Sequence, residues 1–338
     1  MWPEAIELGR LFAEQGYELA LVGGPVRDLL LHRKSHDLDF CSSARPEQFE
    51  PILRRWGHDG FWDMGRKFGT LGAMRRRADG TEVKVEVTTY RSDTYDPDSR
   101  KPEVNYGDTL EGDLSRRDFT VNAMALRVPD LEFVDPFGGA SDLAKGVLRT
   151  PVDPSQSFDD DPLRMMRAVR FVAQLGFSIA PDAAEAISSM RDRIEIVSAE
   201  RVRDELTKML LSDRPRAGLE ALVESGLADI VFPEIPALQL QIDEHHRHKD
   251  VFEHTMIVLE RAIALETGPD GPVPAPDLTL RLAAVMHDIG KPKTRRFEPG
   301  GKVSFHHHDA VGAKMTRKRL KALRFDHHLV EDVSELVN

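Results

Sequence analysis

The sequence predicts an α+β fold, in which a mixed β-sheet with flanking helices is followed by an all-helical part. Residues 81–88 alternate in polarity, with Val83, Val85 and Val87 on one side, which is typical of a half-buried strand. After Pro162, apolar residues recur at helical spacing through most of the chain. With 338 residues, 41% of them hydrophobic, the chain is long enough for about two or three domains with their own cores.

The first 150 residues favour a domain of mixed helices and strands. A helix is expected over 4–15, and strands over 17–22, 38–41, 68–74 and 81–88. Between Arg91 and Tyr106 the composition changes to Asp, Pro, Ser and Arg, which predicts a mobile loop. We therefore expect a first domain over 1–150.

The rest of the chain is predicted to be helical. Helices are expected over 163–174, 181–191, 201–211, 216–225, 251–265, 278–287 and 329–337. A stretch rich in Gly and Pro at 268–276 predicts a linker or surface loop. The last expected helix reaches Asn338 without a closing signal, so we expect the natural protein to continue. We divide this part into 151–240 and 241–338.

The composition excludes several classes of protein. A chain that is 41% hydrophobic and 30% charged is neither disordered nor collagen-like, and it is too long for a small disulfide-stapled protein. The single cysteine, Cys41, cannot form an internal disulfide and indicates a reducing compartment. No apolar run approaches the roughly 20 residues of a membrane-spanning helix, and the start lacks a signal peptide. We expect a cytoplasmic protein without a membrane partner; the oligomeric state stays unknown.

The charge is unevenly distributed. The chain carries 46 Lys and Arg against 57 Asp and Glu, a net charge of −11. Two stretches, 64–78 and 310–325, hold basic residues and no acid. Such runs are as often a solvated helix or strand face as a surface for nucleic acid, and both interpretations stay open.

Two local patterns point to phosphate and metal chemistry. Gly23 and Gly24 stand between an expected strand and a probable helix, where backbone N–H groups can approach a phosphate; a simple tight turn is the alternative. Asp37 and Asp39 lie on one face of an expected strand, about 6.7 Å apart at Cα. They can hold a pair of divalent ions about 3.5–4 Å apart, or form an exposed polar edge. Glu86 is either a third carboxylate or a solvent-facing strand residue.

Five ordered motifs run from the first strand into the helical part. They are GGPVRD at 23–28, DLD at 37–39, RRDFTVNA at 116–123, DPFGG at 135–139 with DL at 142–143, and DDPLRMMRAVRF at 160–171. Together they resemble the motifs of class II tRNA nucleotidyltransferases, the CCA-adding enzymes, and of their bacterial poly(A) polymerase relatives. The resemblance covers about residues 17 to beyond 230. Asp160 departs from it, because the family usually has Glu there.

The resemblance implies a nucleotidyltransferase head, a helical neck and body, and transfer of nucleotides without a template. An RNA 3′-hydroxyl attacks the α-phosphate of a nucleoside triphosphate, and pyrophosphate leaves. The implied partners are the tRNA 3′ end, CTP and ATP. The resemblance implies that Asp37 and Asp39 hold two Mg²⁺ ions, and Glu86 is the candidate for a third catalytic carboxylate. The implied nucleotide-binding residues are Gly23, Gly24, Arg27 and Arg117, with Asp118 accepting from a ribose hydroxyl.

Base selection is assigned to the expected helix after Pro162. Asp161 and Arg164, three residues apart, can present an acceptor and donors to the pairing edge of cytosine or adenine. Arg167 and Arg170 follow at the same spacing and are expected to reach toward phosphate. The spacing alone favours Asp161 as a helix N-cap before Pro162, whereas the resemblance implies the base reader.

The loop over 93–101 resembles the flexible loop of enzymes that add the terminal A. Enzymes limited to CC addition tend to shorten this loop. It therefore favours complete CCA addition.

A second site is expected near the end of the chain. His287-Asp288-Ile289-Gly290-Lys291 resembles an HD-domain signature, with His254 and His308 as further ligands of a divalent metal that activates water for phosphoester hydrolysis. HD domains usually add another Asp, and none precedes Asn338 convincingly, so this site is expected to be incomplete. The alternatives to CCA addition are a poly(A) polymerase, an HD phosphohydrolase acting on 2′,3′-cyclic or related phosphoesters, and an RNA-binding scaffold with a retired site.

Overall fold

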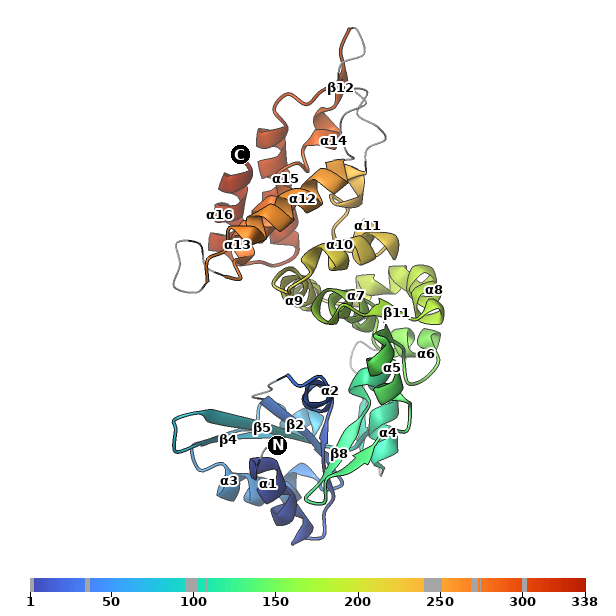
Figure 1. The fold of residues 1–338 in the computed structure, drawn as a ribbon, viewed down its shortest axis with the longest axis vertical. Coiled ribbons are helices and arrows are strands. Elements are labelled where there is room, and N and C mark those ends of the chain that lie inside the picture. Colours follow the sequence, from blue (N-terminus) through green and yellow to red (C-terminus); the bar gives the residue numbers. More distant parts are fainter. Residues whose placement is uncertain are drawn as a thin grey trace. The chain divides into compact units, whose positions relative to one another are not determined.

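The computed structural model describes residues 3–33, 37–94, 103–106, 109–239, 251–268, 273, 275–299 and 303–338. The chain divides into two compact units, Met1–Asp160 and Asp161–Asn338 (Figure 1). The first unit holds the sheet and the second is helical, which confirms the predicted α+β class.

The core of the first unit is a seven-stranded mixed sheet with the strand order β3-β4-β5-β2-β1-β8-β9. Strands β2 and β5 pair in parallel, and the other neighbours pair antiparallel. The strands are β1 (Leu19–Val22), β2 (Asp37–Ser42), β3 (Gly60–Trp62), β4 (Thr70–Arg76), β5 (Glu82–Thr89), β8 (Ala125–Val128) and β9 (Glu132–Val134).

Alternating polarity decides which face of the sheet is covered. Val83, Val85 and Val87 of β5 are buried, and so are Leu38 and Phe40 of β2. Helices α1 (Pro3–Ala13) and α3 (Pro46–Trp56) pack on one face of the sheet and close this core (Figure 1). The polar residues between these apolar positions therefore share the face that α1 and α3 leave uncovered.

The first unit has further short elements around the sheet. The stretch 91–106 was expected as a loop, but β6 (Arg91–Thr94) and β7 (Glu103–Tyr106) pair antiparallel, because a ladder satisfies backbone groups whatever the side chains. Most of the loop over 93–101 that is expected to favour A addition, namely 95–101, lies outside the described residues. The other elements are α2 (Gly24–Leu30), η1 (Arg66–Phe68), α4 (Leu110–Ser115), η2 (Thr120–Asn122), α5 (Gly139–Lys145), β10 (Val147–Leu148) and α6 (Pro154–Asp160).

The second unit begins with a layer of helices in which α7 packs against both α9 and α10. Its α7 carries ten buried residues out of thirteen, which suits a central helix. The elements up to residue 239 are α7 (Leu163–Leu175), β11 (Ser178–Ile179), α8 (Pro181–Met190), η3 (Arg191–Ile196), α9 (Ala199–Leu210), α10 (Pro215–Glu224), α11 (Ala228–Val231) and η4 (Pro236–Leu238).

A second group of helices completes this unit, with α12 against α13 and α16 against both α13 and α15. Every helix expected from periodicity in this group is present, and α14 and α15 are additions. The elements are α12 (Val251–Ala264), α13 (Leu278–Met286), α14 (Lys291–Thr294), β12 (Arg296–Phe297), β13 (Val303–Ser304), α15 (His308–Ala322) and α16 (His327–Val337).

Arg281 fastens α13 to the end of α9. Its guanidinium donates to the carbonyl oxygens of Leu210 and Ser212 at 2.7 and 2.8 Å, and pairs with Glu266 at 2.7 Å. Both side chains of the pair are 5% exposed. The hydrogen bond from Arg281 holds the pKa of Glu266 below its usual range.

In the described part of the chain, no helix combines the length and the apolar character needed to span a membrane.

Candidate active site

Three carboxylates share the face of the sheet opposite α1 and α3. The parallel register of β2 and β5 pairs Asp39 with Glu86 directly, and Asp37 lies two residues before Asp39 on the same face. Sequence periodicity placed the two aspartates on one face but left the position of Glu86 open. The strand pairing, which brings together residues 47 positions apart, puts Glu86 beside them.

The electrostatics of this face suit a bound cation. Burial raises the pKa of Asp39, and the neighbouring Glu86 and Asp37 carboxylates raise it further, while Arg117 opposes the shift. Like charges held together in this way are stabilised by a cation. The donors are all carboxylate oxygens, the ligand type that Mg²⁺ prefers, so the residues present fit the expected metal.

Gly23 allows a close approach between the loop after β1 and Arg117. Its φ of +73° is in the left-handed region, and a Cβ at this position would lie 3.0 Å from Arg117 Nη1. Arg117 is also held by Asp113, a fully buried carboxylate, at 3.0 Å. The loop that includes Gly24, at the start of α2, thus lies beside the Arg117 guanidinium, which the ion pair with Asp113 holds in place.

A hydrogen-bonded chain connects two of the predicted triphosphate and ribose contacts. Arg27 pairs with Asp28 and donates to Asn122 Oδ1 at 2.7 Å. Asn122 in turn donates to Asp118 Oδ1 at 3.0 Å, which also accepts the Phe119 N–H at 2.8 Å. Sequence reasoning named Arg27 and Asp118 as site residues but missed Asn122, although Asn122 stands inside the RRDFTVNA motif.

Asp161 is both a capping residue and an ion-pair partner. Its carboxylate accepts the Leu163 N–H at 3.2 Å at the start of α7, as the capping interpretation expects. It also pairs with Arg201 of α9 at 3.1 Å, a partner that the sequence analysis did not identify. Capping therefore does not exclude recognition, because a carboxylate has acceptor capacity for several donors.

The arginines of α7 differ in their surroundings. Arg164 is buried, at 6% exposure. The guanidinium of Arg167 lies 5.7 Å from the Phe171 ring centre. Arg170 is also buried, pairs with Glu205 and donates to Gln174 Oε1 at 2.5 Å. This geometry directs the Arg170 guanidinium into the helical layer.

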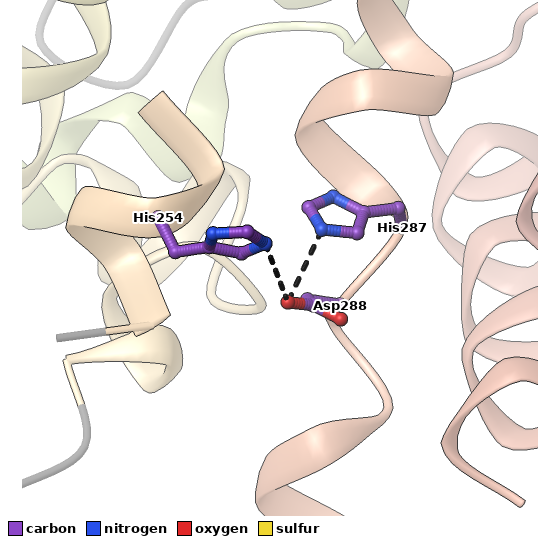
Figure 2. Close-up of side chains that lie close together, drawn as sticks. All are labelled: His254, His287 and Asp288. Atoms are coloured by element: carbon purple, nitrogen blue, oxygen red, sulfur yellow. Dashed lines mark ion pairs between the residues drawn. The ribbon is translucent and has the colours of Figure 1, made fainter. Parts of the chain in front are cut away.

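Two types of metal ligand, imidazole and carboxylate, come together in the second unit. The metal-ligand atoms of His254 on α12, and of His287 and Asp288 just after α13, all lie within 4.8 Å of one another (Figure 2). The Nε2 atoms of His287 and His254 lie 3.1 and 3.8 Å from Asp288 Oδ2. His308 Nε2 lies 3.7 Å from Asp288 Oδ1, so the structure brings all four predicted ligands together.

The charge state of this cluster suits metal ligation. Burial raises the pKa of Asp288, but hydrogen bonds from His287 and Lys291 outweigh it and lower the pKa to about 2. Burial lowers the pKa of His254, which favours the neutral imidazole that binds metals. His287 Nδ1 lies 2.8 Å from the Ala284 carbonyl oxygen, so Nε2, which lies 3.1 Å from Asp288 Oδ2, is the ring nitrogen that faces the cluster and would bind a metal in place of its proton. The donor set fits a divalent transition metal.

Comparisons with known protein families match three parts of the chain. Residues 19–149 match the Poly A polymerase head domain, 176–238 match the probable RNA and SrmB-binding site of polymerase A, and 251–338 match the HD domain. The fold and the sites thus define a protein with a nucleotidyltransferase head, an RNA-binding segment and an HD domain.

Curated relatives are named CCA-adding enzymes. The one from Lactobacillus johnsonii is 38% identical over 219 residues, which cover 64% of this chain and 52% of that protein. The one from Bacillus subtilis is 36% identical over 234 residues, covering 69% and 55%. The chain therefore spans about half the length of the curated relatives it matches.

Solved structures agree with these relatives. A CCA-adding enzyme in its apo form II superposes with a TM-score of 0.71 at 25% identity, covering 98% of this chain and 70% of that one. The Bacillus stearothermophilus CCA-adding enzyme in complex with CTP gives 0.60 at 26% identity, covering 95% and 83%. The chain thus carries a Poly A polymerase head domain and an HD domain, and it is similar to CCA-adding enzymes in sequence and in fold.

Proposed function

We propose that the chain is a metal-dependent RNA nucleotidyltransferase that adds C, C and A to the 3′ end of tRNA without a template. CTP and ATP are its substrates, and pyrophosphate is released. The observation that carries this proposal is the direct pairing of Asp39 with Glu86, beside Asp37, on the face of the sheet opposite α1 and α3. The names of the curated relatives and the complexes of the solved ones, with CTP in one case, support it.

Each part of the head has a role in this reaction. Asp37, Asp39 and Glu86 hold two Mg²⁺ ions, which supply activation of the attacking hydroxyl and neutralisation of the phosphate charge. Gly23, Gly24, Arg27 and Arg117 bind the triphosphate, and the pairing of Arg117 with Asp113 fixes the direction in which it donates. Asp118, oriented by Asn122, accepts from a ribose hydroxyl.

Base selection belongs to α7 in this proposal. Asp161 accepts from the exocyclic amine that cytosine and adenine share, and Arg164 donates to a ring nitrogen or carbonyl. The pairing with Arg201 orients the Asp161 carboxylate. Arg167 contributes to phosphate binding. Arg170 was predicted to bind phosphate as well. Its contacts with Glu205 and Gln174 favour a structural role instead, in which Arg170 stabilises the packing of α7 in the helical layer.

We assign the steps of the proposed reaction to three segments of the chain. We assign catalysis to 1–150, base recognition and RNA binding to 151–240, and the HD domain to 241–338. The segments that match family models, 19–149, 176–238 and 251–338, support this assignment. The cytoplasm stays the predicted location, on the basis of the single cysteine.

Substitution of the aspartates tests the metal assignment. Asp37→Ala and Asp39→Ala should each abolish incorporation of labelled CTP and ATP into tRNA, because carboxylate-held metals stabilise the charge of the transition state. Asp130→Ala, which removes an exposed carboxylate beside β9, is the matched control and should retain activity. Retained incorporation in either site variant, at wild-type circular dichroism, contradicts the assignment.

A second candidate function, phosphoester hydrolysis, is favoured by the histidine and aspartate cluster of the second unit. The cluster of His254, His287 and Asp288, with His308 beside it, favours a metal-dependent phosphohydrolase in the HD domain. The predicted substrates are 2′,3′-cyclic or related phosphoesters. Hydrolysis of a 2′,3′-cyclic nucleotide with added Ni²⁺ or Mn²⁺, and its loss in His287→Ala, tests this activity.

A further inference from the structure

Trp62 lies in one row with two of the site carboxylates. In the register of the sheet, Trp62 of β3 pairs with Gly72 of β4, Gly72 pairs with Glu86 of β5, and Glu86 pairs with Asp39 of β2. Directly paired residues present their side chains on the same face. The edge strand β3 therefore contributes an aromatic residue to the face that carries the carboxylates, four strands wide from Trp62 to Asp39.

The Trp62 indole packs directly over Gly72. A Cβ on Gly72 would lie 2.0 Å from Trp62 Cε2 and 2.2 Å from Trp62 Nε1, far inside any possible contact. The indole thus occupies the space that a side chain at position 72 would fill. Because that space lies between Trp62 and Glu86 in the row, the ring reaches across it toward Glu86.

The indole nitrogen meets the carboxylate. Trp62 Nε1–H donates to Glu86 Oε1 at 3.3 Å. An indole N–H is a donor only, so it can orient a carboxylate without binding a metal itself. A donor to one oxygen fixes the rotation of the carboxylate and directs the other oxygen into the face shared with Asp39.

We propose that Trp62 is a positioning residue, which holds Glu86 in the orientation that binds a divalent cation. This inference rests on the proposed role of Glu86 as the third carboxylate of the site. Gly72 is required for this arrangement, because the side chain of any larger residue at position 72 would displace the indole from Glu86.

Mn²⁺ binding measured by electron paramagnetic resonance tests the proposal in the full chain. The background carries His254→Gln and His287→Gln, so that the HD cluster does not contribute. Loss of a hydrogen bond to a metal-ligating carboxylate weakens metal binding about 10-fold or more, and we expect this for Trp62→Phe, which keeps a ring over Gly72. Gly72→Ala should weaken binding similarly. Phe133→Leu, at an exposed aromatic residue on the opposite edge strand β9, should leave it unchanged.

A double variant separates positioning from general damage. If Trp62 acts through Glu86, Trp62→Phe combined with Glu86→Gln should bind Mn²⁺ no more weakly than Glu86→Gln alone. Mn²⁺ affinity of Trp62→Phe within twofold of the background would overturn the proposal, as would unchanged affinity in Glu86→Gln. If the wild-type chain extends no tRNA, the proposed function fails, whereas the Mn²⁺ titration still decides the role of Trp62.

Discussion

The negative charge of Asp39 lowers the stability of the metal-free folded state. Burial and the two neighbouring carboxylates raise its pKa above the usual value. A carboxyl group with a raised pKa in the folded state binds a proton more readily there than in the unfolded chain. Its ionised form therefore lowers stability at neutral pH, and this penalty disappears as the pH falls below the raised pKa.

Asp39→Asn should for this reason stabilise the metal-free protein. At pH 7 in excess chelator, we expect a small rise in Tm, because Asp39 is exposed and solvent screens much of the repulsion between the carboxylates. Thermal unfolding followed by circular dichroism measures the shift, with Asp130→Asn as the control that should not change it. A lower Tm for Asp39→Asn than for wild type would show that the Asp39 carboxylate is well solvated or paired.

Much of the candidate site could be predicted at the residue scale, because its residues stand in short motifs or at strand periodicity. Asp37 and Asp39 needed only the two-residue period of a strand. The bond from Arg27 to Asn122 joins residues 95 positions apart, and that from Trp62 to Glu86 joins residues 24 apart. No local pattern indicates such pairs, because the packing of separate elements creates them.

Among the elements, α13 depends on one buried ion pair. Arg281 neutralises Glu266 and satisfies two carbonyl groups at the end of α9. Removing one partner of a buried pair leaves an uncompensated charge, which costs more than the pair itself contributes.

Arg281→Ala should destabilise the second unit by about 3–5 kcal/mol. Urea unfolding followed at 222 nm measures the loss, and Arg296→Ala, at an exposed position on β12, should show little. The pKa of Glu266 is lowered from the usual 4.5, so its pairing stabilises the fold above that pH and is lost as the pH falls. The difference between wild type and Arg281→Ala should therefore shrink below about pH 4.5. A constant difference down to pH 3 would show that the pair contributes nothing.

Helix prediction missed α3 and α15, for different reasons. Helix α3 buries Phe49, Ile52 and Trp56 on one side, but Pro46 and Pro51 interrupt the helical pattern of its sequence. Helix α15 buries only Gly312, Ala313, Thr316 and Leu320, so its sequence lacks a strong amphipathic pattern. Both basic stretches, left open by the sequence, have acidic partners on neighbouring elements. Arg319 pairs with Glu234, and further ion pairs of this kind include Arg66–Glu50, Arg75–Glu7, Arg77–Glu4 and Arg317–Glu331.

At the scale of the whole molecule, two sites of different chemistry occupy two compact units. The first offers carboxylate oxygens alone, which suit Mg²⁺, and the second offers imidazoles with one carboxylate, which suit transition metals. Sequence motifs located both sites, because HD and DLD are local signals. They did not show that Lys291 bonds Asp288 at 2.7 Å, since this contact depends on the turn after α13.

The two activities should therefore be separable. His287→Ala should reduce Ni²⁺ or Co²⁺ binding by more than about tenfold, because it removes a ligand of the cluster. It should leave Mg²⁺-dependent nucleotide incorporation within twofold of wild type, while Asp39→Ala should do the reverse. Metal content after dialysis and incorporation of labelled CTP provide the two measurements. Loss of incorporation in folded His287→Ala would contradict the independence of the sites.

Template-independent CCA addition is the central claim, and the size of the product tests it most directly. A tRNA transcript that ends before CCA is incubated with the wild-type chain, Mg²⁺, CTP and ATP, and the product is sized at single-nucleotide resolution. We predict extension by C, C and A and then a stop, with UTP and GTP refused. A long ladder of A that ignores the tRNA end would make the chain a poly(A) polymerase, and no extension at all would contradict a nucleotidyltransferase.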